Sequence, residues 1–491
     1  MRFHDLLEGL DPEWRGDASV DVQGLTHDSR RVVPGMLFCC VPGATTDGHE
    51  HAAAAVAAGA VALLVERFVA PDVPQARVAD VRAALGPVAA RGYGEPSRAL
   101  RCLGVTGTNG KTTTTYLLEH VVQAAGERAG VIGTIGARVD GTRVPGVHTT
   151  PEAPELQLLL ARMRDAGVGT VAMEVSSHAL AQRRVDGTFF AATCFTNLTH
   201  EHLDYHRDLA TYFEAKAHLF TPELTAAAVV NVDDPFGPEL LERARSSGLP
   251  ATAYGLSDRA RFTAVSVEHE ADRTRFVLVD RGSGERAPVT TTLVGGFNVV
   301  NALAAAATAT AAGIGFEHVV AGLCRPLVVP GRLERIDAGQ QFLVFVDYAH
   351  TPDALTRVLD VARSLTSAGR VLVVFGCGGD RDAEKRPMMG AAAAAGADLA
   401  FVTSDNPRSE EPQAIADEIV DGWRGGTPFI VDLDRRAAIG RAVREARRGD
   451  VLVIAGKGHE AGQTTAGRTV PFDDRVVVRE ELEALGELRC T

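Results

Sequence analysis

The chain has 491 residues, of which 45% are hydrophobic and only 5% aromatic, and its formal net charge is -13. Because a single core rarely grows past about 250 residues, we expect about three domains built on buried strands and small-residue helices. The acidic balance excludes a general nucleic-acid or membrane-surface partner, although a local basic pocket can still bind an anionic ligand.

The seven cysteines are scattered, odd in number and form no C-x-x-C pair, which argues against a disulfide framework and a zinc site. The N-terminus carries Asp5 and Glu8 where a signal peptide needs an apolar core, and apolar runs such as 52–65 are too short and alanine-rich to span a membrane. We therefore expect a cytoplasmic protein that is not exported. We also expect a monomer that acts on small molecules and binds neither nucleic acid nor membrane.

Three α/β domains are expected along the chain. Residues 1–98 alternate short apolar runs with alanine-rich helical stretches and end at Gly94-Glu95-Pro96-Ser97, which is typical of a linker. Residues 99–330 form a central unit that closes with the loop 326–331, and residues 331–491 form a third unit.

In the central unit, five apolar runs each lead directly into polar residues, which predicts a doubly wound parallel sheet. Ligands bind at the carboxyl ends of such strands, so these polar clusters are expected to meet along one rim. The predicted strands are 101–105, 130–132, 170–173, 192–195 and 227–230.

The third unit repeats this pattern and is expected to be a Rossmann-like α/β domain. Its apolar runs 370–375, 399–403 and 451–454 lead into polar clusters at 376–381 and 404–408 and to Gly456-Lys457-Gly458-His459-Glu460. Two rims that face each other make a cleft between the central and third domains.

The segment 104–114 has the composition of a phosphate-binding loop in a P-loop-like domain. Glycines without Cβ let backbone N–H groups converge on phosphate oxygens, the helix N-terminus adds a positive dipole end, and Lys111 supplies a cation. Thr112 is placed to hold Mg²⁺ through its hydroxyl. Since Val105 replaces the first glycine of the strict pattern, the loop is a shortened variant; the alternative is an ordinary Gly/Thr-rich turn.

A magnesium enzyme needs hard oxygen ligands, and Glu174 follows a strand at the same rim. Its alternative role is to cap the helix that begins near Ser176. His202 lies in a stretch too polar to be core, and with His200 and His206 it could suggest zinc. No cysteine or second pair supports a closed zinc site, so zinc is the weaker interpretation.

Lys216 lies on the same face of a predicted helix as Phe213 and Phe220. The default interpretation is snorkelling, in which the stem packs and the ammonium reaches water. The alternative is a desolvated amine of lowered pKa that reacts with CO₂ and becomes a carbamate able to hold metal.

Five further polar residues stand at element ends. Asn298 and Asn301 lie at the entry of an alanine-rich helix, where they could cap it or hold a nucleotide. Arg332 lies beside the second domain boundary and can reach a neighbouring domain's phosphates. Asp347 ends a strand and is a candidate for ribose or metal contact or for a local turn, and Thr351 is the predicted N-cap of the next helix.

These motifs, taken together and in this order, resemble the ATP-dependent Mur ligases of peptidoglycan synthesis over essentially the whole chain. The segments similar to the family signatures are 107–112, 173–178, 197–199 with 202–206, 297–301, 331–332 and 347–352. The resemblance implies a UDP-binding first domain, an ATP-binding central domain and an amino-acid-binding third domain. One departure is Glu201, where the family usually has aspartate.

Within the family, the chain looks like the ligase that adds a diamino acid to UDP-N-acetylmuramoyl-L-alanyl-D-glutamate through an acyl phosphate. Asp405-Asn406-Pro407-Arg408 resembles the signature of enzymes that use meso-diaminopimelate. The physics agrees, because the Arg408 fork pairs with the second carboxylate of that substrate, whereas the bare ammonium end of lysine is repelled by it.

The resemblance also implies residue roles. Lys111, Lys216, Glu174 and His202 are the expected catalytic residues, and Mg²⁺ is expected on Thr112, Glu174, His202 and carbamylated Lys216. ATP is expected at Thr106, Gly107, Thr108, Asn109, Gly110, Lys111, Thr112, Thr113, Asn298, Asn301, Arg332 and Asp347. The UDP-peptide is expected at Ser29, Thr149, Thr150, Ser176, Gln182 and Arg184, and diaminopimelate at Arg381, Asp405, Asn406, Pro407, Arg408, Gly456 and Glu460.

Two rival functions remain at this point. Folylpolyglutamate synthase is an amide ligase with a similar ATP loop, but it has neither a comparable first domain nor the 405–408 signature. A regulator that hydrolyses ATP without making a bond is the rival from another class.

Overall fold

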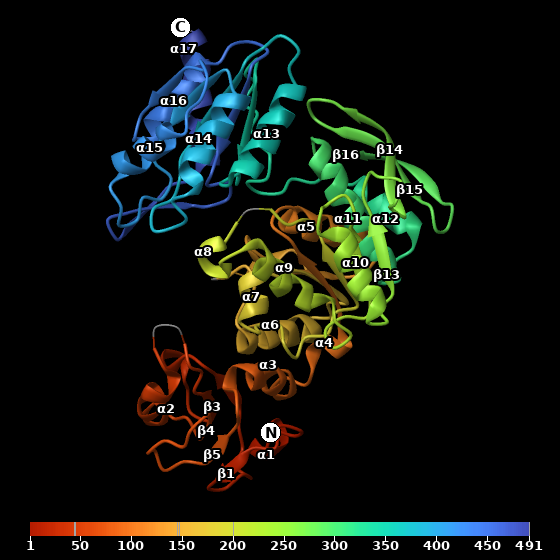
Figure 1. Ribbon diagram of the computed structural model, residues 1–491, viewed down its shortest axis with the longest axis vertical. Coiled ribbons are helices and arrows are strands. Elements are labelled where there is room, and N and C mark those ends of the chain that lie inside the picture. The colour runs from red at the N-terminus through yellow and green to blue at the C-terminus, as the bar shows by residue number, and fades with distance from the viewer. Residues whose placement is uncertain (44–45, 145, 147, 200, 491) are drawn as a thin grey trace.

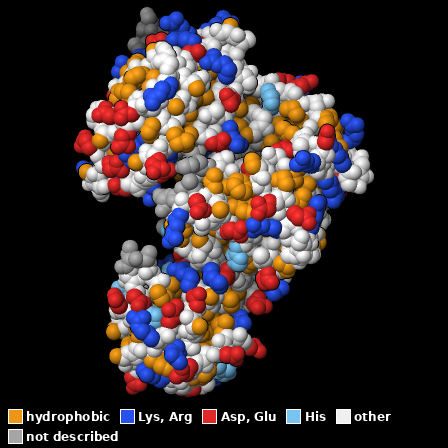
Figure 2. Space-filling view, viewed as in Figure 1, with side chains coloured by type: hydrophobic (Ala, Val, Ile, Leu, Met, Phe, Trp, Pro, Cys, Tyr) orange, Lys and Arg blue, Asp and Glu red, His pale blue; other side chains and the backbone are white. Residues whose placement is uncertain are grey.

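The computed structural model describes residues 1–43, 46–144, 146, 148–199 and 201–490, and only the backbone at 203–204 and 487–490. The chain forms three units that follow one another along the longest axis, with the N-terminus in the first and the C-terminus in the last (Figure 1). None of the helices in these ranges is long and apolar enough to cross a membrane. Figure 2 shows a notch in the surface between the first unit and the rest.

The first unit is a five-stranded sheet in the order β1-β5-β4-β3-β2, parallel except for the β1–β5 pair. Its two faces are covered by α1 with α3 and by α2. Its elements are α1 (Phe3–Leu6), β1 (Glu13–Arg15), β2 (Gly24–Thr26), η1 (Ser29–Arg31), β3 (Met36–Cys39), η2 (Gly48–His51), α2 (Ala52–Ala57), β4 (Ala62–Val65), β5 (Gln75–Arg77), α3 (Val81–Gly92) and α4 (Pro96–Ala99).

The segment 94–97, predicted to be a linker, includes the start of the short helix α4, which begins at Pro96. Proline suits the first turn of a helix, where its missing N–H costs nothing. Ser97 is buried, and its Oγ accepts a hydrogen bond from the backbone N–H of Phe189 at 3.1 Å. The first unit is therefore fixed to the second at this point.

The central unit is an eleven-stranded sheet in the order β16-β15-β14-β13-β12-β11-β6-β10-β7-β8-β9. Its strands are β6 (Arg101–Thr106), β7 (Ala129–Gly133), β8 (Gly136–Val139), β9 (Thr142–Val144), β10 (Thr170–Glu174), β11 (Ala192–Phe195), β12 (Ala228–Asn231), β13 (Ala251–Tyr254), β14 (Phe262–His269), β15 (Thr274–Asp280) and β16 (Arg286–Thr291). The five predicted strands lie in the parallel part of this sheet, and each begins within about one residue of its predicted start. Strand β13, which pairs in parallel with β12, was not predicted.

The sequence did not predict the antiparallel edges, in which β8 and β9 extend one side and β14, β15 and β16 the other. Strand β15 contains the four-residue apolar run 276–279, so a signal for this strand was present in the sequence and was missed; its residues alternate between buried and partly or fully exposed.

The helices of the central unit cover both faces of the sheet. The α5, α11 and α12 side chains pack with Leu103 and Val105 on one face, and those of α6, α7, α9 and α10 pack with Cys102 and Val171 on the other. The bounds are α5 (Lys111–Ala124), α6 (Ala153–Asp165), α7 (Ser177–Ala181), α8 (Leu203–His206), α9 (Leu209–Ala217), η3 (His218–Phe220), α10 (Gly237–Ser246), α11 (Gly296–Ala311) and α12 (Phe316–Leu323).

The third unit is a six-stranded sheet in the order β17-β18-β22-β19-β20-β21, parallel except for β17, with a separate β23–β24 hairpin. Helices α13, α14 and α15 pack on one face, and α16 and α17 on the other. The strands are β17 (Glu334–Arg335), β18 (Leu343–Asp347), β19 (Val371–Phe375), β20 (Leu399–Val402), β21 (Phe429–Val431), β22 (Val451–Ala455), β23 (Gly462–Thr465) and β24 (Arg468–Pro471). The helices are α13 (Pro352–Ser364), α14 (Lys385–Gly396), α15 (Pro412–Asp421), α16 (Arg435–Glu445) and α17 (Asp474–Cys490).

Candidate active site

A cavity of about 630 Å³ lies between the central and third units. Polar residues that follow β6, β10, β11 and β12 line it from the central unit, which confirms the expectation that these clusters meet along one rim. The predicted site residues among its lining are Thr108, Asn109, Gly110, Lys111, Thr112, Thr113, Thr149, Glu174, Ser176, His202, Asn301, Arg332 and Asp347.

The loop between β6 and α5 requires its glycines. Gly107 and Gly110 have φ values of 146° and 87°, a region that side chains with a Cβ rarely adopt. A Cβ on Gly107 would collide with Thr196 Oγ1, and one on Gly110 would collide with Asn301 Oδ1. The backbone therefore forms a close-fitting cradle at the start of α5.

Lys111 lies at the N-terminus of α5, and its Nζ donates to the carbonyl oxygens of Gly107 at 2.7 Å and Thr108 at 2.8 Å. Burial lowers the pKa of Lys111, against the opposing influence of Glu201 and Glu174. The ammonium is thus held directly at the loop.

Glu174 ends β10 and is 1% exposed. Its carboxylate accepts hydrogen bonds from Thr134 N at 2.9 Å and Thr134 Oγ1 at 3.0 Å. The capping role is not the one observed, because the Ser176 side chain caps α7 by accepting from Ala179 N. Glu174 is instead a fixed carboxylate at the cavity wall.

His202 has the left-handed φ of 58°, and its ring lies 4.7 Å from that of His178 between centroids. Burial lowers the pKa of His202 to about 4, although Glu201 opposes the shift. The imidazole is therefore neutral at pH 7, which leaves a lone pair for a metal.

In the described part of the chain, no group of three or more His, Cys, Asp or Glu side chains is arranged to hold a metal ion. Of the histidines considered for zinc, His200 lies outside the described residues. A metal site built on Glu174 and His202 therefore needs a third ligand of another kind.

Lys216 lies on α9 and is only 1% exposed, so the snorkelling interpretation is wrong: the ammonium does not reach open water. Its Nζ lies 4.4 Å from the centroid of the Tyr212 ring, and no hydrogen-bond acceptor for it is found among the described residues. Burial, and next the charge of Lys111, hold the pKa of Lys216 well below its usual range, against Glu201. The described residues that line the cavity do not include Lys216, Thr106, Gly107 or Asn298.

Arg332 crosses from the third unit to the loop. Its Nη2 donates to Thr112 Oγ1 at 3.1 Å, its guanidinium carbon lies 4.6 Å from the Tyr348 ring centroid, and its buried Nε has no partner in the described part of the chain. Arg332 therefore reaches the phosphate-binding loop of the central unit, and its contact with the phosphates of a nucleotide stays a prediction.

Asp347 performs the local turn role, since its carboxylate accepts from Leu333 N at 2.6 Å and Ala349 N at 2.7 Å. Burial raises the pKa of Asp347.

The amide of Asn298 donates to Val294 O at 2.8 Å, and that of Asn301 donates to Asn298 Oδ1 at 3.0 Å, so neither side chain caps α11.

The residues expected to hold the muramoyl peptide lie together. Arg184 donates to Thr150 O at 3.1 Å and to Gln182 Oε1 at 2.7 Å, and Thr150 Oγ1 accepts from Ser176 N at 3.0 Å. Thr149 is close to Thr134, with 3.1 Å between their hydroxyl oxygens.

Ser29 belongs to η1 of the first unit, and the structure does not bring it to the cavity. Arginines of the first unit form ion pairs with the central unit: Arg31 is paired to Glu155 at 2.5 Å and Arg82 to Glu152 at 2.7 Å.

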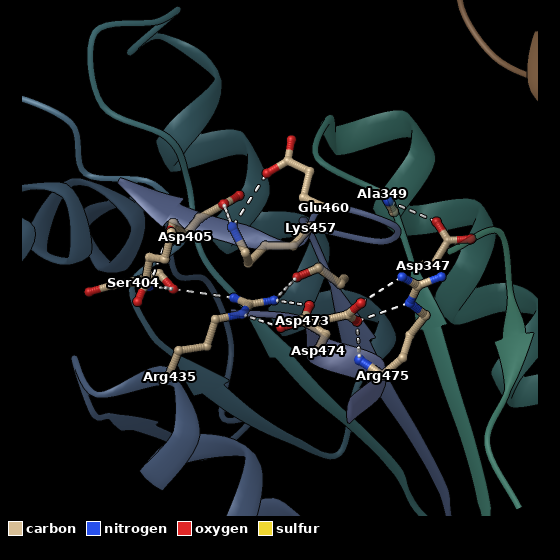
Figure 3. Close-up of polar contacts among 12 residues, drawn as sticks. Asp347, Ala349, Ser404, Asp405, Arg435, Lys457, Glu460, Asp473, Asp474 and Arg475 are labelled. Atoms are coloured by element: carbon tan, nitrogen blue, oxygen red, sulfur yellow. Dashed lines mark hydrogen bonds and ion pairs between the residues drawn. The ribbon is translucent and has the colours of Figure 1, made fainter. Parts of the chain in front are cut away.

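The diaminopimelate candidates follow β19, β20 and β22 and are outside the residues that line the cavity. Figure 3 shows two of them, Asp405 and Glu460, on either side of Lys457. Asn406 Nδ2 donates to Asp405 Oδ1 at 3.0 Å and to Glu460 Oε2 at 2.9 Å. Gly456 has a φ of 114°, and a Cβ there would press on the Asp405 carboxylate.

Arg408 has the left-handed φ of 54° and donates through Nη1 to Gly379 O at 2.5 Å. Pro407 is buried beside it, and Arg381 is exposed. Tyr348 connects this cluster to the cavity, because it lines the cavity and its ring lies 5.3 Å from that of His459, the neighbour of Glu460.

Sequence reasoning missed two features of the site. The first is Lys457, which is 0% exposed within the cluster of Asp405, Asn406 and Glu460. The second is a contact between the two units, in which His350 Nε2 lies 3.3 Å from Glu201 Oε1. Burial raises the pKa of Glu201, but the His350 hydrogen bond and nearby cations lower it by more.

The residues present fit a magnesium triphosphate. The glycine cradle leaves no room for a Cβ, and Lys111 and Arg332 bring two cations to it. Thr199 Oγ1 and Arg332 Nε are buried polar atoms without a partner among the described residues, and both residues line the cavity. Carboxylate, imidazole and hydroxyl donors are available in Glu174, His202 and Thr112.

Three family descriptions match the chain in order. They are the Mur ligase family, catalytic domain, at residues 21–93, the Mur ligase middle domain at 105–309, and the Mur ligase, glutamate ligase domain at 331–458.

The chain is 45% identical, over 98% of its own length and 98% of the relative's, to the UDP-N-acetylmuramoyl-L-alanyl-D-glutamate--2,6-diaminopimelate ligase of Gloeobacter violaceus. A solved structure of a ligase with the same name matches at 33% identity and a TM-score of 0.71, covering 99% of each chain. The folylpolyglutamate synthase of Mycobacterium tuberculosis, solved with ADP and AMPPCP, matches at 20% identity and a TM-score of 0.62, covering 76% of this chain and 92% of that one. The last similarity shows the fold alone.

Proposed function

The chain belongs to the Mur ligase family, and we propose that it joins meso-2,6-diaminopimelate to the D-glutamate of UDP-N-acetylmuramoyl-L-alanyl-D-glutamate at the expense of ATP. The full-length relatives that carry this name support the substrate pair. The single observation that carries the proposal is the meeting of the glycine cradle, Glu174, His202 and the third unit's Arg332 around one cavity.

The three units divide the substrates between them in this proposal. Residues 1–98 bind the uridine diphosphate end through Ser29, residues 99–330 bind ATP and the muramoyl peptide, and residues 331–491 bind the amino acid. The protein is proposed to act as a cytoplasmic monomer. The free state of the six cysteines in the described residues agrees with a reducing compartment.

ATP binds in the cradle at residues 106–113, with Arg332 and Asn301 beside it. The γ-carboxylate of the D-glutamate attacks the γ-phosphate and forms an acyl phosphate, while Lys111 neutralises the charge that gathers on the phosphoryl oxygens. Bound Mg²⁺, held by Thr112, Glu174, His202 and the carbamate of Lys216, would supply further neutralisation of that charge.

The carbamate follows from the surroundings of Lys216. Burial and the charge of Lys111 lower the pKa of the Lys216 amine and so favour its neutral form, whose nitrogen attacks CO₂ and gives up a proton to leave an anionic carbamate able to serve as an oxygen ligand. This change supplies the third ligand that Glu174 and His202 lack.

The amine of diaminopimelate then attacks the acyl carbon, and phosphate leaves from the tetrahedral intermediate. Asp405 and Glu460 suit the distal ammonium of this substrate, and Arg408 suits its distal carboxylate. Approach of the third unit aligns the amine with the acyl phosphate and excludes water that would hydrolyse it.

The test is phosphate release from ATP with a panel of amines that includes meso-diaminopimelate and L-lysine. The proposal expects release to require both the UDP-dipeptide and an amine, with diaminopimelate strongly preferred. A protein that hydrolyses ATP alone, the regulator alternative, would release phosphate without either. Positional exchange of isotope among ATP oxygens, dependent on the UDP-dipeptide, reports the acyl phosphate.

A further inference from the structure

Lys457 lies in the loop after β22, has no exposed surface, and is surrounded by oxygen atoms (Figure 3). Its Nζ donates to Gly462 O at 2.7 Å, to Asn406 Oδ1 at 3.2 Å and to Glu460 Oε2 at 3.3 Å. Asp405 Oδ1 lies 3.7 Å away. Because an ammonium has three protons, these acceptors use its whole donor capacity and leave none for a substrate.

The amide of Asn406 is fixed by the same arrangement. Its Oδ1 accepts from Lys457 Nζ and from Thr464 N at 3.0 Å, and its Nδ2 donates to the carboxylates of Asp405 and Glu460. The backbone donor at Thr464 determines which way the amide points. One oxygen of each carboxylate is therefore committed to Asn406, and the other oxygen of each stays available.

The charges of the cluster do not cancel. Asp405 and Glu460 carry two negative charges, and Lys457 supplies one positive charge against them. The nearby Arg435 does not complete the balance, since it is paired with Asp474 at 2.7 Å in a fully buried ion pair. One net negative charge remains, and Glu460 is 34% exposed, so a ligand's ammonium can reach it.

Lysine is rare in this chain, in which four of the 50 basic residues are lysines: Lys111, Lys216, Lys385 and Lys457. Three of these four lie at sites described above: Lys111 in the phosphate loop, Lys216 buried in α9, and Lys457 in the cluster with Asp405, Asn406 and Glu460. A compact ammonium with protons in tetrahedral directions fits between converging oxygens, whereas a planar guanidinium fork does not. The use of lysine at 457 in an arginine-rich chain therefore points to a need for this particular shape.

We propose that Lys457 is a positioning residue for the amine substrate: it holds Asp405, Asn406 and Glu460 in place and sets the pocket's charge so that it accepts one distal ammonium. This proposal rests on the proposed function, because it takes diaminopimelate as the amine. Lys457 does not touch the substrate, and it acts through the two carboxylates and the amide.

The test compares Lys457→Met with the unchanged enzyme in steady-state kinetics at saturating ATP and UDP-dipeptide. We expect the KM for diaminopimelate to rise at least tenfold, with kcat falling less than threefold. Positional isotope exchange in ATP, which needs no amine, should stay within twofold. With 2-aminopimelate, in which hydrogen replaces the distal ammonium, the two enzymes should differ less than twofold.

Two further variants complete the design. Lys457→Arg should also raise the KM for diaminopimelate, because the fork does not fit among the oxygens. Lys385→Met, which changes a lysine of the same unit outside the cluster, should leave every value unchanged. An unaltered KM for diaminopimelate in Lys457→Met, or an equal loss for both amines, would overturn the proposal. Failure of the unchanged enzyme to require an amine would instead refute the proposed function.

Discussion

Two buried lysines of this protein lie in opposite surroundings. Lys216, at the phosphate end of the cleft, faces the Tyr212 ring and the charge of Lys111, with no oxygen acceptor among the described residues. Lys457, at the amine end, lies among the oxygens of Asp405, Asn406, Glu460 and Gly462.

The contrast shows that burial alone does not decide what a lysine does. Without acceptors, burial favours the neutral amine, which is a nucleophile toward CO₂. With acceptors on every side, the ammonium stays a fixed cation that organises its neighbours. Lys216 is thus suited to a covalent change at the phosphate end, and Lys457 to substrate recognition at the amine end. A substitution at one end should change the binding or reaction at that end more than at the other.

The largest expected effect is at Lys216. Lys216→Ala should lower turnover by at least about 10³-fold, since a ligand of the metal that stabilises the transferring phosphoryl group is lost. Bicarbonate or a short carboxylic acid should partly restore activity to Lys216→Ala but not to Lys216→Arg, measured as phosphate release. Lys385→Ala is the matched control, and full activity of Lys216→Ala would remove the carbamate from the proposal.

Arg408→Ala comes next and acts at the amine end. It should weaken diaminopimelate binding by about 2–5 kcal/mol, the scale for leaving a charged partner unpaired, with little change in ATP affinity. Isothermal titration against each ligand measures both quantities. Arg424→Ala, an exposed arginine of the same unit, is the control. Equal weakening of both ligands would contradict the assignment of Arg408 to the amine end.

Arg332→Ala disturbs the phosphate end from the third unit. Loss of its contact with Thr112 and of its charge beside the cradle should weaken ATP binding by about 1.5–3 kcal/mol, the scale of a hydrogen bond to a charged group. The KM for diaminopimelate should change less than twofold. The exposed Arg335→Ala provides the comparison, and an ATP affinity that matches this control would exclude the proposed role.

The smallest effect is expected at Glu201, between the two ends. Glu201→Asp keeps the negative charge, moves it away from His350 and introduces the acid that the family usually has. The activation free energy calculated from kcat/KM should therefore change by less than about 1 kcal/mol. Glu201→Gln, which removes the charge beside His202, should lose more. Identical kinetics for the two variants would show that the charge of Glu201 has no effect on catalysis.

Much of the fold could be predicted from the sequence, because the central strands are continuous apolar runs that end in polar clusters. The N-cap at Thr351 was also readable, and its Oγ1 accepts from Ala354 N as expected. The edge strands β14, β15 and β16 were not predicted: the apolar runs of β14 and β16 are short and broken by polar residues, whereas the four-residue apolar run 276–279 of β15 was overlooked.

The site divides in the same way. Local motifs predicted the cradle at Gly107–Lys111, but the contact of Arg332 with Thr112 joins positions 220 residues apart and depends on how two units meet. Lys457 stands between two glycines in what reads as a solvated loop, so only the packing of β22 against its neighbours identifies it as buried. The burial of Lys216 could not be predicted from helical spacing, because the same spacing is also compatible with an exposed amine.

The scarcity of lysine has a practical consequence. A reagent that acylates primary amines has few targets in this chain: four side chains and the α-amino group, whose nitrogen already donates to Val22 O at 3.1 Å. Lys216 and Lys457 are each buried within their own unit, so each should react only when that unit opens locally, and a carbamate on Lys216 would make it inert altogether. Peptide mass mapping after timed labelling would then measure local opening of the central unit at Lys216 and of the third unit at Lys457, with Lys385 as the reference.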